Sequence, residues 1–287
     1  MKIKPWLAFA LITTISWGVW GAFIEIPEKA GFPATLGYIV WALTMIIPSV
    51  IALKRTGWIL EKNKKAVKFG LIIGILGSAG QLILFQALRT GPAYLVFPFV
   101  SLSPLVTILL SLWLLKEKAS FKSWIGIIIA LIAIPLLSYQ PPENGQKFGF
   151  LWIFLALLVF LSWGIQAYFM KMANNHMRAE SIFFYMMISG LALIPVALFM
   201  TDFRQHINWG FKGPYLAAGI QILNSIGALF IVYAFRYGRA IIVSPLTNAG
   251  APVITIVLSL LIYGVFPHTI ILVGMLLAIT AIFLLAD

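Results

Sequence analysis

Long apolar runs separated by short polar segments make up almost the whole chain. A helix that crosses a bilayer needs about 20 consecutive, mostly apolar residues. When each run is followed to its flanking charges, glycines and prolines, the pattern predicts ten transmembrane helices, at about residues 5–24, 32–53, 67–88, 92–115, 121–139, 148–170, 181–200, 214–235, 240–263 and 268–286. A polar linker at residues 140–147 separates the fifth run from the sixth. The predicted fold class is therefore an all-α integral membrane protein.

The composition excludes most soluble classes of protein. Apolar and aromatic residues make up 62% of the 287 residues, and charged residues only 10%, whereas soluble domains carry about 25% charged residues. A cytosolic enzyme, a secreted domain and a disordered tail are excluded on this ground. The chain contains no cysteine, which also excludes disulfides, thiol nucleophiles and Cys-ligated metals.

The net charge of +12 would suggest nucleic-acid binding in a soluble protein. Here Lys and Arg cluster in the polar segments between apolar runs, so we expect no nucleic-acid partner. If the N-terminus is placed inside, 15 of the 20 Lys and Arg residues fall on the inner side. The positive-inside rule then predicts a multi-pass protein of the plasma (inner) membrane with both termini in the cytoplasm.

The two halves of the chain resemble each other at an offset of 146 to 148 residues, and residues related by this offset are called repeat mates below. The matching segments are 16–18 with 162–164, 47–48 with 194–195, 87–91 with 234–238 and 96–98 with 243–245, followed by Pro104, Thr107 and Ser111 with Pro252, Thr255 and Ser259. Each half, residues 1–142 and 143–287, holds five predicted helices. Because five is odd, the second half enters the membrane from the opposite side, which is the inverted-topology plan of many secondary transporters.

On these motifs the chain resembles the drug/metabolite transporter superfamily, specifically its EamA-type members. The resemblance rests on Trp17 and Trp163 with their adjoining glycines and on residues 91–98 and 114–118. Family members commonly place a Glu where Glu117 stands and a second Glu in the other half, where this chain has Val265. The resemblance implies a secondary transporter of a small organic metabolite, such as an amino acid, with export as one option. An uptake carrier for a sugar, nucleobase or quaternary amine is the alternative.

Small residues repeat along the fifth and tenth predicted helices, as Gly126, Ala130 and Ala133 and as their repeat mates Gly274, Ala278 and Ala281. Such stripes let helices approach closely, so we predict a packing seam. By resemblance these two helices lie at the edge of the bundle. A monomer and a homodimer are therefore both open.

Polar side chains within six of the predicted helices indicate a site, because a polar group in hydrocarbon must be satisfied or face a wet cavity. We predict a central cavity in the lipid bilayer, in which amides and hydroxyls orient a small-molecule solute and aromatic rings supply flat walls. The predicted solute-binding residues are Trp17, Trp20, Gln81, Tyr94, Ser101, Gln166, Gln221, Asn224 and Asn248. Hydrogen bonding between helices is the alternative interpretation of each residue.

Charged residues are absent from the middle of every predicted helix, and Glu25, Glu28, Glu117 and Glu180 lie near helix ends. Acids within the membrane are the usual carriers of coupled protons, so the pattern favours a neutral or zwitterionic solute over a simple cation. We interpret Glu25 and Glu28 as solvated loop acids. Attraction of a cation at the outer mouth is the alternative.

The sequence carries no signature of catalysis. None of the three histidines stands in a metal-ligand pair, and neither a nucleophile elbow nor a phosphate loop occurs. We therefore expect no catalytic residue, no metal and no cofactor. A membrane-embedded enzyme is therefore a less favoured class. A channel is also less favoured, because it needs a ring of filter groups, usually from symmetric subunits.

Overall fold

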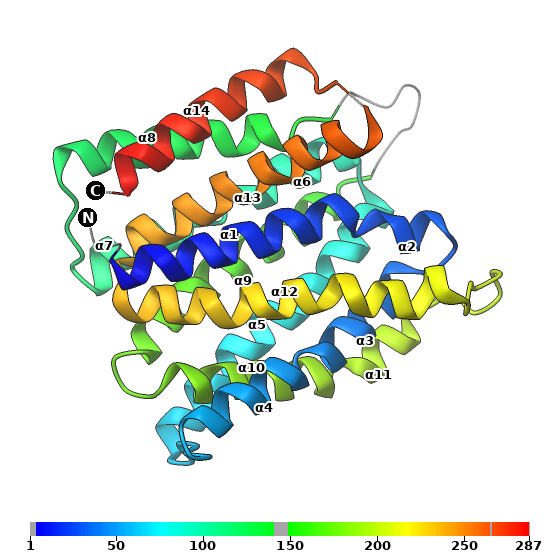
Figure 1. Ribbon diagram of the computed structural model, residues 1–287, viewed down its shortest axis with the longest axis horizontal. Coiled ribbons are helices and arrows are strands. Elements are labelled where there is room, and N and C mark those ends of the chain that lie inside the picture. The colour runs from blue at the N-terminus through cyan, green and yellow to red at the C-terminus, as the bar shows by residue number, and fades with distance from the viewer. Residues whose placement is uncertain (1–3, 141–148, 265, 287) are drawn as a thin grey trace.

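A computed structural model describes residues 4–140, 149–264 and 266–286, and these residues form a helical bundle without strands (Figure 1). The helices are α1 (Pro5–Phe23), α2 (Glu25–Lys29), α3 (Ala34–Thr44), α4 (Ile46–Arg55), α5 (Lys64–Thr90), α6 (Ala93–Ser101), α7 (Pro104–Leu114), α8 (Phe121–Leu137), α9 (Leu151–Ala173), α10 (Ala179–Ala192), α11 (Ile194–Phe199), the π-helical turn η1 (Phe211–Tyr215), α12 (Leu216–Tyr237), α13 (Ala240–Tyr263) and α14 (Thr269–Leu285).

Eight helical segments of the described chain are long and apolar enough to cross a membrane. Two shorter apolar helices, α8 and α14, have 17 residues each. At 1.5 Å per residue, such a helix is about 26 Å long, close to the hydrocarbon core of about 30 Å. The protein is therefore a multi-pass integral membrane protein, and each of the ten predicted apolar runs contains helix.

Prolines interrupt runs that the sequence pattern presented as continuous. The run at 32–53 divides into α3 and α4 at Met45, three residues before Pro48. The run at 181–200 divides in the same way at Leu193, two residues before Pro195, the repeat mate of Pro48. Proline has no N–H for the carbonyl four residues earlier, so the helix path breaks in the preceding turn. The two halves share this break.

The fourth run differs from its counterpart in the second half. Residues Leu102 and Ser103 separate α6 from α7, directly before Pro104. In the second half, α13 continues as one helix through Pro252, the repeat mate of Pro104. The predicted membrane spans at 92–115 and 240–263 are both confirmed by length and composition, as Leu95–Leu114 and Ala240–Ile262. They differ in that the first is broken before its proline and the second is continuous.

The helices of the two halves interlock. Helix α1 packs along α12 and α13, while α9, the helix that matches α1, packs along α5 and against α6 and α7. Helices α8 and α14 lie side by side at one edge of the bundle (Figure 1). The glycine and alanine stripes are buried there: an added Cβ at Gly126 or Gly274 would lie 3.0 Å from a leucine of the other helix. The predicted packing seam is confirmed as a contact between α8 and α14.

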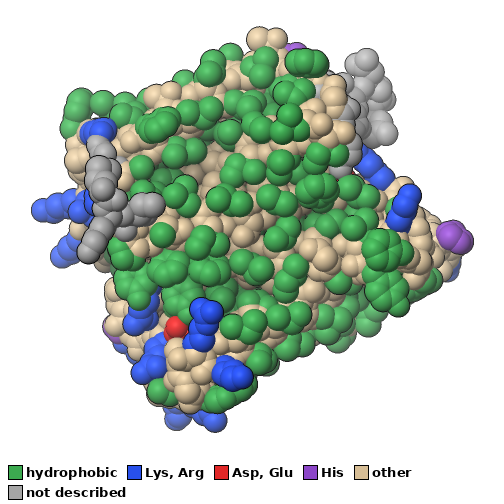
Figure 2. Space-filling model, viewed as in Figure 1, with side chains coloured by type: hydrophobic (Ala, Val, Ile, Leu, Met, Phe, Trp, Pro, Cys, Tyr) green, Lys and Arg blue, Asp and Glu red, His purple; other side chains and the backbone are tan. Residues whose placement is uncertain are grey.

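The bundle has two ends that carry the loops. Helix α1 begins and α14 ends at the same end, which we call the terminal face; the opposite end, which carries α2 and η1, we call the distal face (Figure 1). On the side in view, hydrophobic side chains are spread over the flank between these faces, and Lys and Arg side chains gather toward the ends (Figure 2). Trp113 and Phe283 are 78% and 73% exposed, as expected for side chains that face lipid.

Candidate functional site: a central cavity open at the distal face

A cavity of about 1130 Å³ lies between the helices of the two halves. Exposed residues of the distal face, among them Glu25, Glu28 and His206, line its mouth. Buried side chains such as Met45, Met170 and Phe235 form its deep end. Within the described chain, no residue of the terminal-face loops lines it. The cavity is thus open at the distal face and closed at the terminal face.

The structure brings the polar residues singled out in the sequence to this one cavity. Eight of them line its wall, from helices α1, α5, α6, α9, α12 and α13: Trp17, Trp20, Gln81, Ser101, Gln166, Gln221, Asn224 and Asn248. The side chain of Tyr94, the ninth, lies outside the described residues. Their placement is compatible with the predicted role in solute binding, which stays a prediction.

Three of the cavity residues are held by other protein groups. The amide of Gln221 accepts from Trp20 Nε1 at 3.0 Å and donates to the carbonyl of Gly37 at 3.3 Å, and Gln221 is only 5% exposed. Asn248 Nδ2 donates to Ser244 O at 2.9 Å, and the Ser101 hydroxyl donates to Pro98 O at 2.8 Å. These groups shape the wall, and because Gln221 is so buried, its amide presents little surface to a solute.

Three other carboxamides remain available. The side chains of Gln81, Gln166 and Asn224 are half-buried and make no hydrogen bond to another group in the described part of the chain. A Cβ added at Gly77 would lie 2.1 Å from Gln166 Nε2, so the amide of Gln166 rests against α5 one turn from Gln81. Each carboxamide offers two donors and an acceptor. Together they form the free polar set of the cavity wall.

Two tryptophans join the halves in matching ways. Trp17 Nε1 donates to Asn224 O at 3.3 Å, and its repeat mate Trp163 donates to Gly77 O at 3.4 Å. Gly77 is the repeat mate of Asn224. The indoles lie against glycines, since a Cβ added at Gly227 or Gly80 would come within 2.4 and 2.6 Å of them. The paired Trp-Gly motifs of the sequence thus place two rings in the cavity wall.

Two threonines repeat the same symmetry. Thr255 Oγ1 donates to Gly18 O at 2.8 Å, and its repeat mate Thr107 donates to Gly164 O at 2.9 Å. Gly18 and Gly164 are also mates, and a Cβ at either would approach the facing helix within 2.5 Å. Glycine is required at both positions for this close approach.

Sequence reasoning missed an aromatic part of the wall on α3. Tyr38 and Trp41 line the cavity together with Met45, and Tyr38 OH donates to Gly190 O at 3.0 Å. The spacing of three and four residues places all three on one helix face. That spacing could have indicated a shared cavity face, but in the sequence these side chains do not differ from other apolar residues of a transmembrane helix.

Charge is confined to the mouth. Among the described residues that line the cavity, the charged ones are Glu25, Glu28 and Arg89, all at the distal face. Glu25 pairs with Lys29 at 2.5 Å, and both side chains are more than half exposed. The interpretation of Glu25 as a solvated acid therefore agrees with its surroundings. The deep part of the cavity offers amides, hydroxyls and rings.

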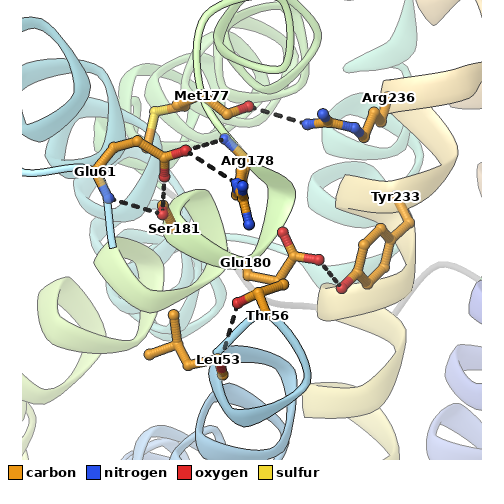
Figure 3. Close-up of polar contacts among 9 residues, drawn as sticks. All are labelled: Leu53, Thr56, Glu61, Met177, Arg178, Glu180, Ser181, Tyr233 and Arg236. Atoms are coloured by element: carbon orange, nitrogen blue, oxygen red, sulfur yellow. Dashed lines mark hydrogen bonds and ion pairs between the residues drawn. The ribbon is translucent and has the colours of Figure 1, made fainter. Parts of the chain in front are cut away.

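Polar contacts close the terminal face. The Glu61 carboxylate, between α4 and α5, accepts from Arg178 N at 3.2 Å and from the Ser181 hydroxyl, and Glu180 Oε1 on α10 accepts from Tyr233 OH on α12 at 2.6 Å (Figure 3). Arg236 Nη1 donates to Met177 O at 3.1 Å (Figure 3). Each contact joins separate segments of the chain.

Glu117 contributes a further contact at this face. Its two carboxylate oxygens accept from Ala240 N and Ile241 N, both at 3.1 Å, and so cap the N-terminus of α13. A carboxylate is favoured there because the helix dipole is positive and the first N–H groups lack helical partners. The resemblance places a second Glu at the position of Val265, and this residue lies outside the described residues.

Within the described residues, no group of three or more His, Cys, Asp or Glu side chains is arranged to hold a metal ion. Fold and cavity define the class: a multi-pass membrane protein with a solute-sized chamber between two halves. The model of the EamA-like transporter family matches residues 4–139 and again residues 150–286. The chain therefore belongs to the EamA-like transporter family, and the family predicted from its motifs is confirmed.

Individual relatives agree with this membership. An uncharacterised protein of Methanocaldococcus jannaschii is 30% identical over 132 residues, which cover 46% of this chain and 95% of that protein. Protein LicB of Haemophilus influenzae is 23% identical over 289 residues, covering 88% of this chain and 93% of LicB. A solved crystal structure with 16% identity has a TM-score of 0.77 and covers 96% of this chain and 95% of its own, so the fold is shared.

Proposed function

We propose that the protein is a secondary transporter that moves a small neutral or zwitterionic metabolite by alternating access around the central cavity. The observation that carries this proposal is the cavity itself, open at one face, closed at the other and lined by three free carboxamides. A chamber of this kind lies between halves related by sequence, as in transporters built from inverted repeats. Membership in a transporter family supports the same conclusion.

The proposed topology has ten membrane crossings in two inverted halves, residues 1–142 and 143–287, with both termini in the cytoplasm. The matching hydrogen bonds of Trp17 and Trp163 support two equivalent halves. The archaeal relative also supports two equivalent halves, because 95% of its length matches only 46% of this chain. In this topology the distal face is the outer one, so the structure is open to the outside. Because α8 and α14 lie at the edge of the bundle, both a monomer and a homodimer are compatible with this topology.

The polarity of the cavity supports the solute class. Its deep wall carries donors and acceptors but no charge among the described residues, and an ion without a counter-charge is unfavourable within a membrane. An amino acid or similar metabolite, moved outward or inward, fits this wall. The rings of Trp17, Trp20, Trp41 and Tyr38 favour a quaternary amine as the second candidate, because aromatic faces attract such cations.

A thermal-shift screen of the purified protein against a metabolite library tests the proposal. We expect one chemical class to raise the unfolding temperature, and radiolabelled members of that class to enter protein-containing vesicles faster than empty ones. Amino acids and quaternary amines in the same library separate the two candidates. Currents through single open pores, or turnover of a stabilising compound into a product, would contradict a transporter that works by alternating access.

A further inference from the structure

One contact at the closed terminal face has no chemical equivalent at the open distal face. Lys171, near the end of α9, donates through Nζ to Phe235 O at 3.0 Å and to Gly238 O at 2.6 Å. These carbonyls end α12, where the helix dipole is negative and a cation is favoured. The contact holds α9 against α12 below the deep end of the cavity.

The repeat places different chemistry at the matching positions of the distal face. The mates of Lys171, Phe235 and Gly238 are Glu25, Leu88 and Gly91. An ionised carboxylate has no hydrogen to donate to carbonyls, and its charge is repelled by the C-terminus of α5. When the distal face closes, Glu25 therefore cannot repeat the contact that Lys171 makes.

A guanidinium is available at that place. Arg89 directly follows Leu88 in the last turn of α5 and is the repeat mate of Arg236. Both Glu25 and Arg89 line the cavity mouth. In the open structure Arg89 donates to Met200 O at 3.1 Å in an exposed contact, and Glu25 pairs with Lys29 in another. Exposed contacts of this kind contribute little and are easily exchanged.

We propose that Glu25 and Arg89 form an ion pair across the mouth when the distal face closes, in place of the Lys171 contacts at the terminal face. This gate rests on the proposed alternating access, since it belongs to the conformation that the structure does not occupy. The closed terminal face carries the Lys171 contacts beside the ion pair of Glu61 and Arg178, whose atoms are 3.7 Å apart. At the distal face, the ion pair of Glu25 and Arg89 would take the place of the Lys171 contacts.

The absence of cysteine from the chain allows a direct test without knowledge of the solute. Ala167 lines the cavity on α9, so Ala167→Cys reports access to it. In vesicles of defined orientation, a membrane-impermeant maleimide added at the terminal face labels this cysteine only when the terminal face is open and the distal face closed. The rate of labelling therefore measures the conformation that the ion pair would stabilise.

We expect Glu25→Gln and Arg89→Gln each to lower this rate about threefold, the effect of a modest ion pair. The double variant should be no slower than either single variant, because the two residues act as one pair. Lys212→Gln, an exposed charge of the same face that does not line the cavity, is the control and should leave the rate unchanged. Unaltered rates in the single variants, or multiplied effects in the double variant, would overturn the gate.

The same experiment separates the gate from the proposed function. If Ala167→Cys is never labelled from the terminal face, while it is labelled from the distal face, the cavity does not alternate and the proposed function fails. If it is labelled from both faces at rates that do not depend on Glu25 and Arg89, alternating access stands and only the ion pair is wrong.

Discussion

Trp20 donates its indole N–H to the amide oxygen of Gln221 at 3.0 Å and thereby fixes the orientation of that amide in the cavity wall. The other end of the amide donates to Gly37 O on α3, so Gln221 links α1, α12 and α3. Gln221, a candidate solute ligand from the sequence, therefore also serves as a structural link between three helices. The polar residues of the cavity divide into such links and into free groups.

Gln221→Leu should destabilise the protein. The substitution removes the hydrogen bonds to the half-buried N–H of Trp20 and to Gly37 O, each of which contributes about 1 kcal/mol. We expect a lower unfolding temperature in detergent, measured by intrinsic fluorescence. Gln81→Leu is the matched control, because Gln81 makes no hydrogen bond to another described group and leucine is favourable in a membrane core. Equal unfolding temperatures for both variants would contradict the division of these residues into links and free groups.

Two glycines of α12 should respond in opposite ways to alanine. A Cβ at Gly227 would lie 2.4 Å from the ring of Trp17, whereas a Cβ at Gly219 meets nothing within 4 Å. Alanine is favoured over glycine inside a helix by about 1 kcal/mol. Gly219→Ala should therefore raise the unfolding temperature or leave it unchanged. Gly227→Ala should lower it, because the indole must move. A neutral Gly227→Ala would show that Trp17 is not packed as described.

Glu117→Gln should weaken the cap of α13. A neutral amide accepts through only one oxygen, so one of the two backbone N–H groups loses its partner and the helix dipole loses its negative charge. The expected cost is about 1 kcal/mol, with a larger loss for Glu117→Ala. Thermal unfolding checks this, with the exposed Glu28→Gln as control. If Glu117→Gln and Glu28→Gln behave alike, the cap contributes nothing.

Much of the architecture could be predicted from sequence periodicity because a bilayer imposes helix length and polarity on every run. The repeat and the cavity residues followed from the same logic: Gln81, Gln166 and Asn224 are polar where hydrocarbon would exclude them. The breaks at Met45 and Leu193 were also accessible, since Pro48 and Pro195 each remove a helical hydrogen bond.

Other features depend on partners far apart in the chain. The sequence places Gln221 and Asn224 on one face of a helix, but only the packing of α3 against α12 makes the amide of one a link and leaves the other free. Lys171 looked like an ordinary loop cation at a helix end. Its position against the carbonyls of Phe235 and Gly238 depends on how α9 meets α12, which no local pattern contains.

The orientation of the chain is a separate prediction. A reporter fused after Asp287 should be cytoplasmic, because 15 of the 20 Lys and Arg residues lie in segments assigned to that side. A phosphatase active only outside the cytoplasm and a fluorescent protein that matures only within it give opposite signals. Phosphatase activity would contradict the assignment of the distal face to the outside.

The affinity of the purified protein for the solute found by the thermal-shift screen tests most directly whether that solute binds in the central cavity. Wild-type protein should bind one solute molecule per chain. Gln81→Leu, Gln166→Leu and Asn224→Leu should each weaken binding about tenfold or more, the effect of losing a hydrogen bond worth about 1.4 kcal/mol, while Gly219→Ala binds as wild type. Unchanged affinity in all three leucine variants, with their folds intact, would show that the solute does not bind in this cavity.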